Sequence, residues 1–256
     1  MIKVGVLGAA GKMGGEVCRA IAEDPETTLV AAVDPAGPGG TVAGVSIGAS
    51  IDGLAGAQVA VDFTHPDAVM GNLRWLIERG IHAVVGTTGI GDADLQEVRA
   101  LLEKADGRSN VFVAPNFAIG AVLMTRFAAL AARHLPQAEI VELHHDNKAD
   151  APSGTAIATA RAIAAERRGD PARARESAET VAGARGGTVE GVPIHSVRLR
   201  GLVAHQEVIL GGPGQTLSIR HDSTDRTSFM PGVLLAVKAV AGRPGLTVGL
   251  EQLLDL

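Results

Sequence analysis

Residues 3–14 read KVGVLGAAGKMG, a short apolar run followed by Gly8, Gly11 and Gly14. A helical pattern follows directly, over residues 13–23. Glycines let a backbone turn sharply and approach a pyrophosphate, and a helix N-terminus offers free N–H groups to its oxygens. A tight turn without a ligand would use the same glycines. Strand, glycine turn and helix in this order nevertheless favour a dinucleotide-binding site.

Asp34 follows a second apolar run, residues 29–33, and lies 20 residues after Gly14. A carboxylate at this distance suits hydrogen bonds from an adenosine ribose and disfavours a 2′-phosphate. Pro35 stands where an arginine would accept that phosphate, whereas Lys12 is either a phosphate contact or an exposed lysine at a helix start. We therefore expect NADH to be used at least as well as NADPH.

The first 115 residues alternate short runs rich in Val and Ile with amphipathic helical patterns. We expect strands at 3–7, 29–33, 59–63, 82–85 and 111–114, and helices at 13–23, 66–79 and 92–104. This alternation predicts a parallel sheet covered on both faces. Ligands of such sheets bind at the carboxyl ends of the strands, so residues 86–89 and 114–117 face either a nicotinamide or only solvent. Residues 35–56 are rich in Gly, Ala and Pro and predict an irregular loop.

After residue 116 the pattern changes. We expect helices at 117–133, 154–168 and 228–241, a strand at 139–144, and an antiparallel meander of runs 197–202, 204–210 and 216–219. Residues 167–190 lack apolar periodicity and predict a mobile or extended excursion. The fold class is therefore an α/β Rossmann-like parallel-sheet domain, residues 1–116 with 228–256, plus an inserted α+β domain, residues 117–227.

Residues 142–155, ELHHDNKADAPSGT, gather two histidines, a lysine and three acids before Ser153 opens a helix. His144 and Lys148 are able to transfer protons near neutral pH, and the helix start suits a substrate carboxylate. Surface histidines beside a simple N-cap would give the same pattern. A metal site is a third interpretation, but neighbouring strand residues such as His144 and His145 point to opposite faces. No further ligands occur at metal-binding spacing, so we expect no metal.

Composition excludes several classes of protein. The 256 residues are 46% hydrophobic and 20% charged, which is typical of a globular chain. A net charge of −5 and 2% aromatic residues argue against nucleic-acid binding. No apolar run approaches the roughly 18 residues of a membrane helix. The single cysteine, Cys18, excludes an internal disulfide and predicts a small buried helix residue. We expect a soluble, cytoplasmic protein.

The chain resembles the 4-hydroxy-tetrahydrodipicolinate (dihydrodipicolinate) reductase family, enzymes of the diaminopimelate route to lysine, and is most similar to actinobacterial members. The resemblance rests first on residues 142–156, ELHHDNKADAPSGTA. Further segments resemble family segments in the same order, at residues 4–14, 62–64, 86–89, 114–117 and 220–229.

The resemblance implies an NADH- or NADPH-dependent reduction of a cyclic imine dicarboxylate, with loss of water, by a homotetramer built through the sheet of the inserted domain. His144 would be the proton donor and acceptor and Lys148 a second donor, while His145 would contact the substrate. Substrate carboxylates would lie at Ser153, Gly154 and Thr155. The implied cofactor residues are Gly8, Ala9, Ala10, Gly11, Lys12, Met13, Asp34, Gly86, Thr87, Thr88, Ala114, Pro115, Asn116 and Phe117.

Two other functions compete with this one. Another oxidoreductase of the same fold would act on a different small acid. A non-catalytic NADH-sensing module would bind the cofactor without turnover, but it leaves residues 142–156 unexplained.

Overall fold

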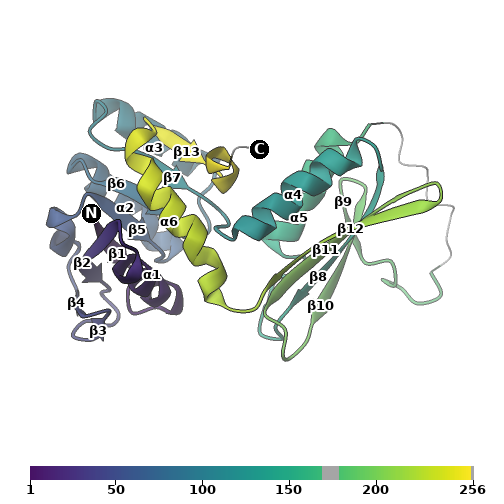
Figure 1. The fold of residues 1–256 in the computed structure, drawn as a ribbon, viewed down its shortest axis with the longest axis horizontal. Helices are drawn as coiled ribbons and strands as arrows, with labels where there is room; N and C mark the ends of the chain where they lie inside the picture. Colours follow the sequence, from purple (N-terminus) through teal and green to yellow (C-terminus); the bar gives the residue numbers. More distant parts are fainter. Residues whose placement is uncertain (169–178, 255–256) are drawn as a thin grey trace. The chain divides into compact units, whose positions relative to one another are not determined.

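The computed structural model describes residues 1–168 and 179–254 and divides the chain into two compact units (Figure 1). The first unit is Met1–Phe117 with Phe229–Leu256, and the second is Ala118–Ser228. The boundaries expected from the sequence lie one residue earlier at each crossing. Among the described residues, no helix is long and apolar enough to span a membrane.

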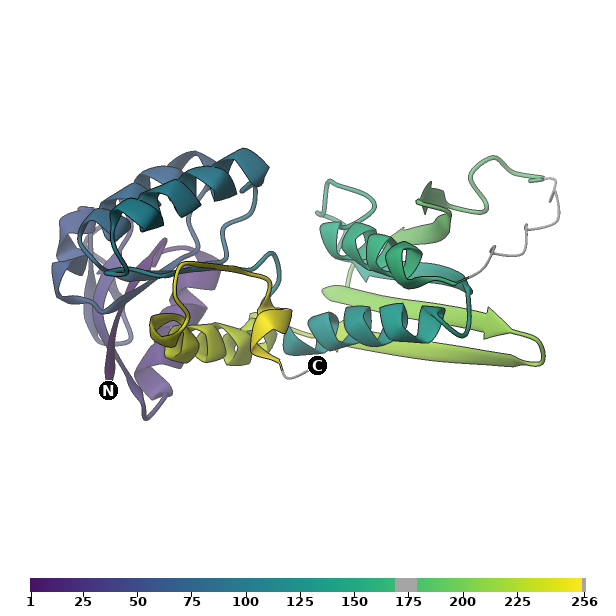
Figure 2. The same ribbon diagram turned by 90° about the horizontal axis from the view of Figure 1, so that it is seen from above.

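The first unit is built on an eight-stranded sheet with strand order β13-β7-β6-β5-β1-β2-β4-β3. Every neighbouring pair is parallel except β3 and β4. Helices α1 and α6 pack together on one face, and α2 and α3 pack on the other (Figure 2). The strands are β1 (Ile2–Leu7), β2 (Thr27–Val33), β3 (Thr41–Val42), β4 (Val45–Gly48), β5 (Val59–Asp62), β6 (His82–Val85), β7 (Val111–Val113) and β13 (Leu246–Val248). The helices are α1 (Lys12–Glu23), α2 (Pro66–Glu78), α3 (Asp92–Lys104) and α6 (Met230–Ala239), with short 3-10 helices η1 (Ile51–Gly56), η3 (Val240–Gly242) and η4 (Leu250–Leu253).

These elements follow from local sequence. The central strands are almost wholly apolar because both faces are covered, and Val4, Val6, Val84 and Phe112 have no exposed surface. Cys18 is buried in α1, as expected, and burial raises the pKa of its thiol to about 12. The side chain of His65 caps α2 by accepting a hydrogen bond from the N–H of Asp67.

The loop expected over residues 35–56 is wrong in part. It contains β3, β4 and η1, and β4 extends the sheet by pairing with β2 through Ala32↔Ile47 and Val33↔Gly48. A strand of four residues flanked by glycines has too short a pattern to detect, and only Ile47 is buried. Strand β13 is also unforeseen, because three residues carry no periodicity.

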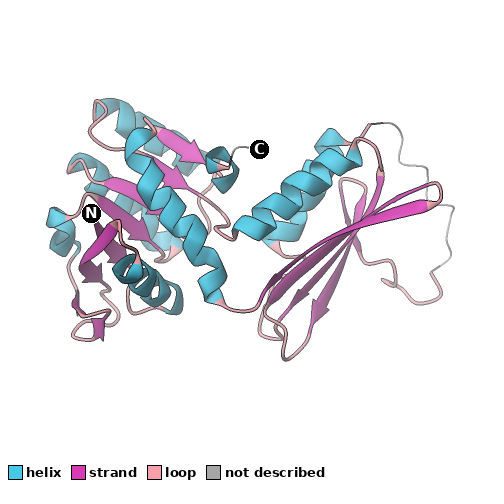
Figure 3. Ribbon diagram, in the orientation of Figure 1, coloured by secondary structure: helices cyan, strands magenta, loops and turns pink. Residues whose placement is uncertain are grey.

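The second unit is a five-stranded mixed sheet, order β12-β11-β8-β10-β9, with α4 and α5 packed together against it (Figures 2 and 3). Its core joins Met124 of α4 and Ile163 of α5 to Ile140, Ile194 and Val208 of the sheet. The elements are α4 (Ile119–Ala132), β8 (Gln137–His144), α5 (Gly154–Glu166), β9 (Gly187–Val189), β10 (Val192–Arg198), β11 (Ala204–Gly212) and β12 (Gln215–Ser223), followed by η2 (Arg226–Phe229).

The predicted three-stranded meander is wrong in the pairing of its first strand. Strands β11 and β12 form the predicted hairpin, but β10 pairs in parallel with β8, which lies between β10 and β11. Strand β10 also begins earlier than expected, at Val192, and ends at Arg198. The excursion expected over residues 167–190 falls partly on residues 169–178, which lie outside the described residues. Within the remainder, β9 pairs with β10.

Candidate active site

The glycine turn after β1 is shaped by close backbone approaches. Gly8 has a φ of +80°, and an added Cβ would lie 2.5 Å from the carbonyl oxygen of Phe63. At Gly14 an added Cβ would lie 2.0 Å from the carbonyl oxygen of Gly8. The N–H groups of Gly8 and Ala9 both donate to the carbonyl of Val33, at 2.9 and 3.2 Å, which ties the turn to the end of β2. Only glycine fits at Gly8 and Gly14.

The N-terminus of α1 faces this turn without an acidic residue in its first turn and without a side-chain cap. No carboxylate of its own first turn therefore offsets its partial positive charge, an arrangement that favours a bound phosphate. The exposed Lys12 stands at the first position of α1. These features fit a dinucleotide cofactor.

A cavity of about 360 Å³ opens at the carboxyl ends of β1, β2 and β5. This is where the order of the sheet reverses around β1, the usual ligand position in open α/β sheets. Of the residues proposed from the sequence, Gly8, Gly11 and Asp34 line it. The remaining lining residues are Leu7, Val33, Pro35, Ala36, Ile51, Phe63, Thr64, His65, Ala68 and Asn72.

The carboxylate of Asp34 is held in place by two backbone donors. Oδ2 accepts from the N–H of Ala10 at 3.0 Å, and Oδ1 accepts from the N–H of Ala36 at 3.0 Å. Because each carboxylate oxygen has a further lone pair, Asp34 retains the capacity to accept from a ribose hydroxyl. The side chain is half-buried in the cavity wall, and Pro35 beside it is exposed.

The loops after β6 and β7 lie at the same sheet edge but do not line the cavity. An added Cβ at Gly86 would lie 2.2 Å from the ring of Phe63, and Phe117 packs on that ring at 5.8 Å between centroids. Thr88 and Pro115 are exposed, whereas Thr87, Ala114 and Phe117 are buried. Phe63 therefore connects both loops to the cavity.

Asp62 at the end of β5 is a fully buried carboxylate that the sequence did not single out. Its Oδ1 accepts from the N–H and hydroxyl of Thr64, at 2.9 and 2.7 Å, and from the hydroxyl of Thr87 at 2.8 Å. Its Oδ2 accepts from the amide of Asn72 at 2.8 Å. The carboxylate thus fixes two cavity-lining residues and the loop after β6.

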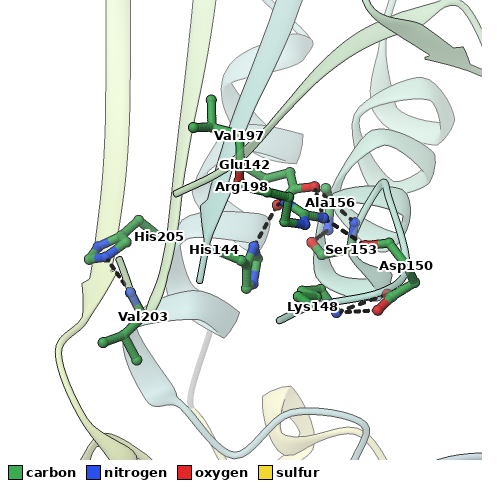
Figure 4. A network of polar contacts seen from close by, with 10 residues as sticks. All are labelled: Glu142, His144, Lys148, Asp150, Ser153, Ala156, Val197, Arg198, Val203 and His205. Atoms are coloured by element: carbon green, nitrogen blue, oxygen red, sulfur yellow. Dashed lines mark hydrogen bonds and ion pairs between the residues drawn. The ribbon is translucent and has the colours of Figure 1, made fainter. Parts of the chain in front are cut away.

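In the second unit, the polar cluster is centred on Glu142, which is fully buried (Figure 4). Its Oε2 lies 2.5 Å from Nδ1 of His144. The guanidinium of Arg198, on the neighbouring β10, donates to both carboxylate oxygens at 2.8 and 2.9 Å. The N–H of Ser153 donates to Oε1 at 3.2 Å. Glu142 and His144 were part of the cluster predicted from the sequence. Arg198 was not, because it lies 56 positions away from Glu142.

His144 is largely enclosed, with 15% of its side chain exposed. Burial lowers the pKa of its imidazole, Glu142 opposes that effect, and the cations Lys148 and Arg198 add to it. The imidazole of the free chain is therefore predominantly neutral at pH 7.

Lys148 and His145 lie in the loop between β8 and α5. The ammonium of Lys148 donates to both carboxylate oxygens of Asp150, at 2.7 and 2.8 Å, and 22% of the side chain is exposed. Asp150 is in turn held through its carbonyl, which accepts from Nη2 of Arg198 at 2.7 Å. His145 is exposed. Figure 4 shows Lys148 and His144 in the same region of the cluster, below Glu142.

The start of α5 combines two expected features. Ser153 is a buried N-cap whose hydroxyl accepts from the N–H of Ala156 at 3.1 Å. An added Cβ at Gly154 would meet nothing within 4 Å, so Gly154 borders open space. Thr155 lies in the first turn of α5. Among residues 1–168 and 179–254, no group of three or more His, Cys, Asp or Glu side chains is arranged to hold a metal ion.

Two models of one protein family together match almost the whole chain. Residues 2–117 match the family model of the dihydrodipicolinate reductase N-terminus, and residues 120–254 match that of the C-terminus. The chain is 55% identical to a 4-hydroxy-tetrahydrodipicolinate reductase of Nocardia farcinica over 100% of this chain and 99% of the relative. It is 53% identical to one of Mycolicibacterium vanbaalenii over all of both chains. A dipicolinate-bound dihydrodipicolinate reductase from Paenisporosarcina sp. TG-14 superimposes with a TM-score of 0.86 and 40% identity, covering 99% of this chain and 100% of that one.

The glycine turn and strand-end cavity, together with the family match of the first unit, define a nicotinamide-dependent oxidoreductase. The chain belongs to the dihydrodipicolinate reductase family, which confirms the resemblance found in its sequence. It catalyses the reduction step of diaminopimelate and lysine biosynthesis.

Proposed function

We propose that this chain reduces 4-hydroxy-tetrahydrodipicolinate to tetrahydrodipicolinate, with loss of water, using the side chains of residues 142–155 for proton transfer and substrate binding. The observation that carries this assignment is the buried Glu142 beside His144, followed by Lys148 and by the start of α5. The names of the relatives and the dipicolinate bound to the Paenisporosarcina enzyme support the same substrate class.

The glycine turn and Asp34 would hold the cofactor. Bound NADH or NADPH supplies a hydride to the conjugated ring of the dehydrated substrate. The N-terminus of α1 would bind the pyrophosphate, and Asp34 would accept hydrogen bonds from the adenosine ribose. We propose that NADH is used at least as well as NADPH, because the fixed carboxylate of Asp34 repels a 2′-phosphate and Pro35 offers no cation to it.

Protons must balance the hydride. The overall reaction consumes one hydride and one proton and releases one water, so one side chain must deliver a proton to the reduced ring. His144 or Lys148 would do so. The imidazole is predominantly neutral in the free chain, and two substrate carboxylates near it would favour its protonated form. Lys148 would remain the second donor, paired with Asp150 until substrate arrives.

The two carboxylates of the substrate would be bound by the start of α5 and by the loop before it. Gly154 borders open space at the positive end of the helix dipole, and Thr155 follows it. Ser153 would act by shaping this turn, since its hydroxyl caps α5. His145 is exposed and would contribute a further donor.

The variant His144→Gln tests the proton-transfer assignment. We expect kcat to fall about 100-fold or more, in the range typical of general acid–base catalysis, with little change in NADH affinity. His134→Gln, an exposed position just after α4, is the matched control and should keep full activity. Full activity of His144→Gln would show that His144 transfers no proton in the reaction.

We also propose that the chain assembles as a homotetramer through the sheet of the second unit. Helices α4 and α5 pack on the face that carries Ile140 and Val208, and alternation along the strands places Val141, Leu143 and Ile209 on the opposite face. These three apolar side chains are only half-buried. Light scattering should give four times the chain mass, and Ile209→Lys should yield smaller species. A monodisperse monomer of the unaltered chain would exclude this assembly.

A further inference from the structure

Glu142 is an ionised carboxylate enclosed by donors. Burial alone favours its neutral form, yet hydrogen bonds from Arg198, Ser196 and His144 hold the pKa of Glu142 below its ordinary value. Because a carboxylate only accepts hydrogen bonds, the short contact of 2.5 Å to His144 requires that Nδ1 of the imidazole carries the proton. The contact therefore selects one tautomer of His144.

Arg198 holds Glu142 in this position from the adjacent strand. In the parallel register of β10 and β8, Arg198 lies opposite His144, and Ser196 lies opposite Glu142. The two terminal nitrogens of Arg198 engage both oxygens of Glu142, a planar bidentate contact that fixes the orientation of the carboxylate. Nη2 also binds the carbonyl of Asp150. One guanidinium thus fixes the partner of His144 and the loop that carries Lys148.

We propose that Glu142, clamped by Arg198, is the positioning residue of His144: it holds the imidazole with Nδ1 as donor, so that Nε2 is the atom that exchanges a proton with the substrate. This inference rests on the proton-transfer role proposed above for His144. It parallels the carboxylate–histidine pairs in which a buried acid fixes the tautomer and stabilises the imidazolium as it forms. Glu142 itself contacts no substrate and acts only through His144.

In the described part of the chain, three charged groups dominate the electrostatics of His144. Glu142 comes from β8, Arg198 from β10 and Lys148 from the loop, and the residue opposite on β11 is the uncharged Ala204. Glu142 favours the imidazolium, and the two cations disfavour it. Loss of the carboxylate charge must therefore lower the pKa of His144, because only the opposing groups remain.

The variant Glu142→Gln tests this directly. An NMR titration of the imidazole Cε1–H signal of His144, in the full chain without ligands, should show its pKa falling by about 1 to 2 pH units. The ring nitrogens should lose their fixed tautomer. In turnover at pH 7, kcat should fall about 10- to 100-fold, while NADH affinity stays within about twofold because the cofactor cradle is untouched.

The chain offers a matched control on the same strand. Glu139 accepts a hydrogen bond from His195 of β10 and pairs with Arg185, so Glu139→Gln removes a partly exposed carboxylate from a histidine on the other face of the sheet. It should leave the titration of His144 unchanged. Glu142→Asp, which keeps the charge, should restore part of the His144 titration and part of kcat, and it serves for both readouts if Glu142→Gln does not fold.

An unchanged pKa and tautomer of His144 in the folded Glu142 variant would overturn the proposal. So would equal effects of the Glu139 and Glu142 variants on His144. The titration needs no substrate, so its failure is distinct from failure of the proposed function, which would appear as absence of turnover in the unaltered chain.

Discussion

Replacement of Gly14 by alanine should damage the cofactor cradle, whereas the same change at Gly15 should not. The two glycines are neighbours in α1. A Cβ at Gly14 would lie 2.0 Å from the carbonyl oxygen and 2.6 Å from the carbonyl carbon of Gly8, both backbone atoms. A Cβ at Gly15 would find its nearest neighbour, the carbonyl oxygen of Ala9, at an ordinary 3.7 Å.

The size of the effect follows from these distances. To reach an acceptable separation at Gly14, the turn must move by about 1 Å, yet Gly8 and Ala9 are hydrogen-bonded to Val33. Overpacking of this kind costs about 1 to 3 kcal/mol of stability. Gly15→Ala should instead add about 1 kcal/mol, because alanine is the better residue inside a helix. The two variants should thus differ by about 4 to 16 °C in melting temperature.

Cofactor binding should separate the two variants further. A displaced turn misaims the N–H groups of α1, and loss of one hydrogen bond to a charged group costs about 1.5 to 3 kcal/mol, or a 10- to 100-fold weaker Kd for NADH. Scanning fluorimetry and titration of NADH fluorescence measure both effects. Wild-type NADH affinity in Gly14→Ala, with a melting temperature equal to that of Gly15→Ala, would show that a Cβ at Gly14 does not displace the glycine turn.

Two further substitutions and one labelling experiment have defined outcomes. Asp34→Arg should raise the ratio of NADPH to NADH efficiency, measured as kcat/KM for each cofactor, because it replaces a repelling charge with an attracting one; an unchanged ratio would remove Asp34 from the ribose site. Asp62→Asn should lower the free energy of unfolding by about 1 to 3 kcal/mol, measured in urea, and should weaken NADH binding. The reason is that the new amide N–H₂ would face Thr64 and Asn72, which both donate hydrogen bonds to Asp62 and would lose an acceptor. Wild-type values for both quantities would contradict the proposed anchoring of Thr64. Cys18, whose pKa burial raises to about 12, should resist a thiol reagent at pH 8 until the chain unfolds, and rapid labelling of the folded chain would contradict its burial.

Strong local signals at both ends of one helix allowed the sequence to predict its bounds to the residue. Helix α3 spans Asp92–Lys104 as expected, because acidic residues begin it, a lysine ends it and Asp94 accepts from the N–H of Gly91 at its start. The glycine turn was also predicted correctly, since the backbone approaches so closely at Gly8 and Gly14 that no residue with a Cβ fits there.

What the sequence concealed was pairing between distant segments. The parallel register of β10 with β8 depends on contacts across more than 50 positions, and the expected meander put β10 beside β11 instead. The same pairing brings Arg198 to Glu142, so the contact between these two side chains could not be predicted from the sequence. Asp62 belongs to a segment that resembles the family, but the sequence did not predict its role. That role depends on hydrogen bonds from Thr87 and Asn72, which are close to Asp62 only in the folded chain.

The most direct test of the central claim is oxidation of NADH and NADPH by the purified chain. Substrate is generated in situ from pyruvate and aspartate semialdehyde by the preceding synthase of the pathway. We predict rapid oxidation that requires the synthase and both of its substrates, with NADH at least as effective as NADPH. NADH that binds to the chain but is not oxidised under these conditions would contradict the proposed reaction and leave only the cofactor site.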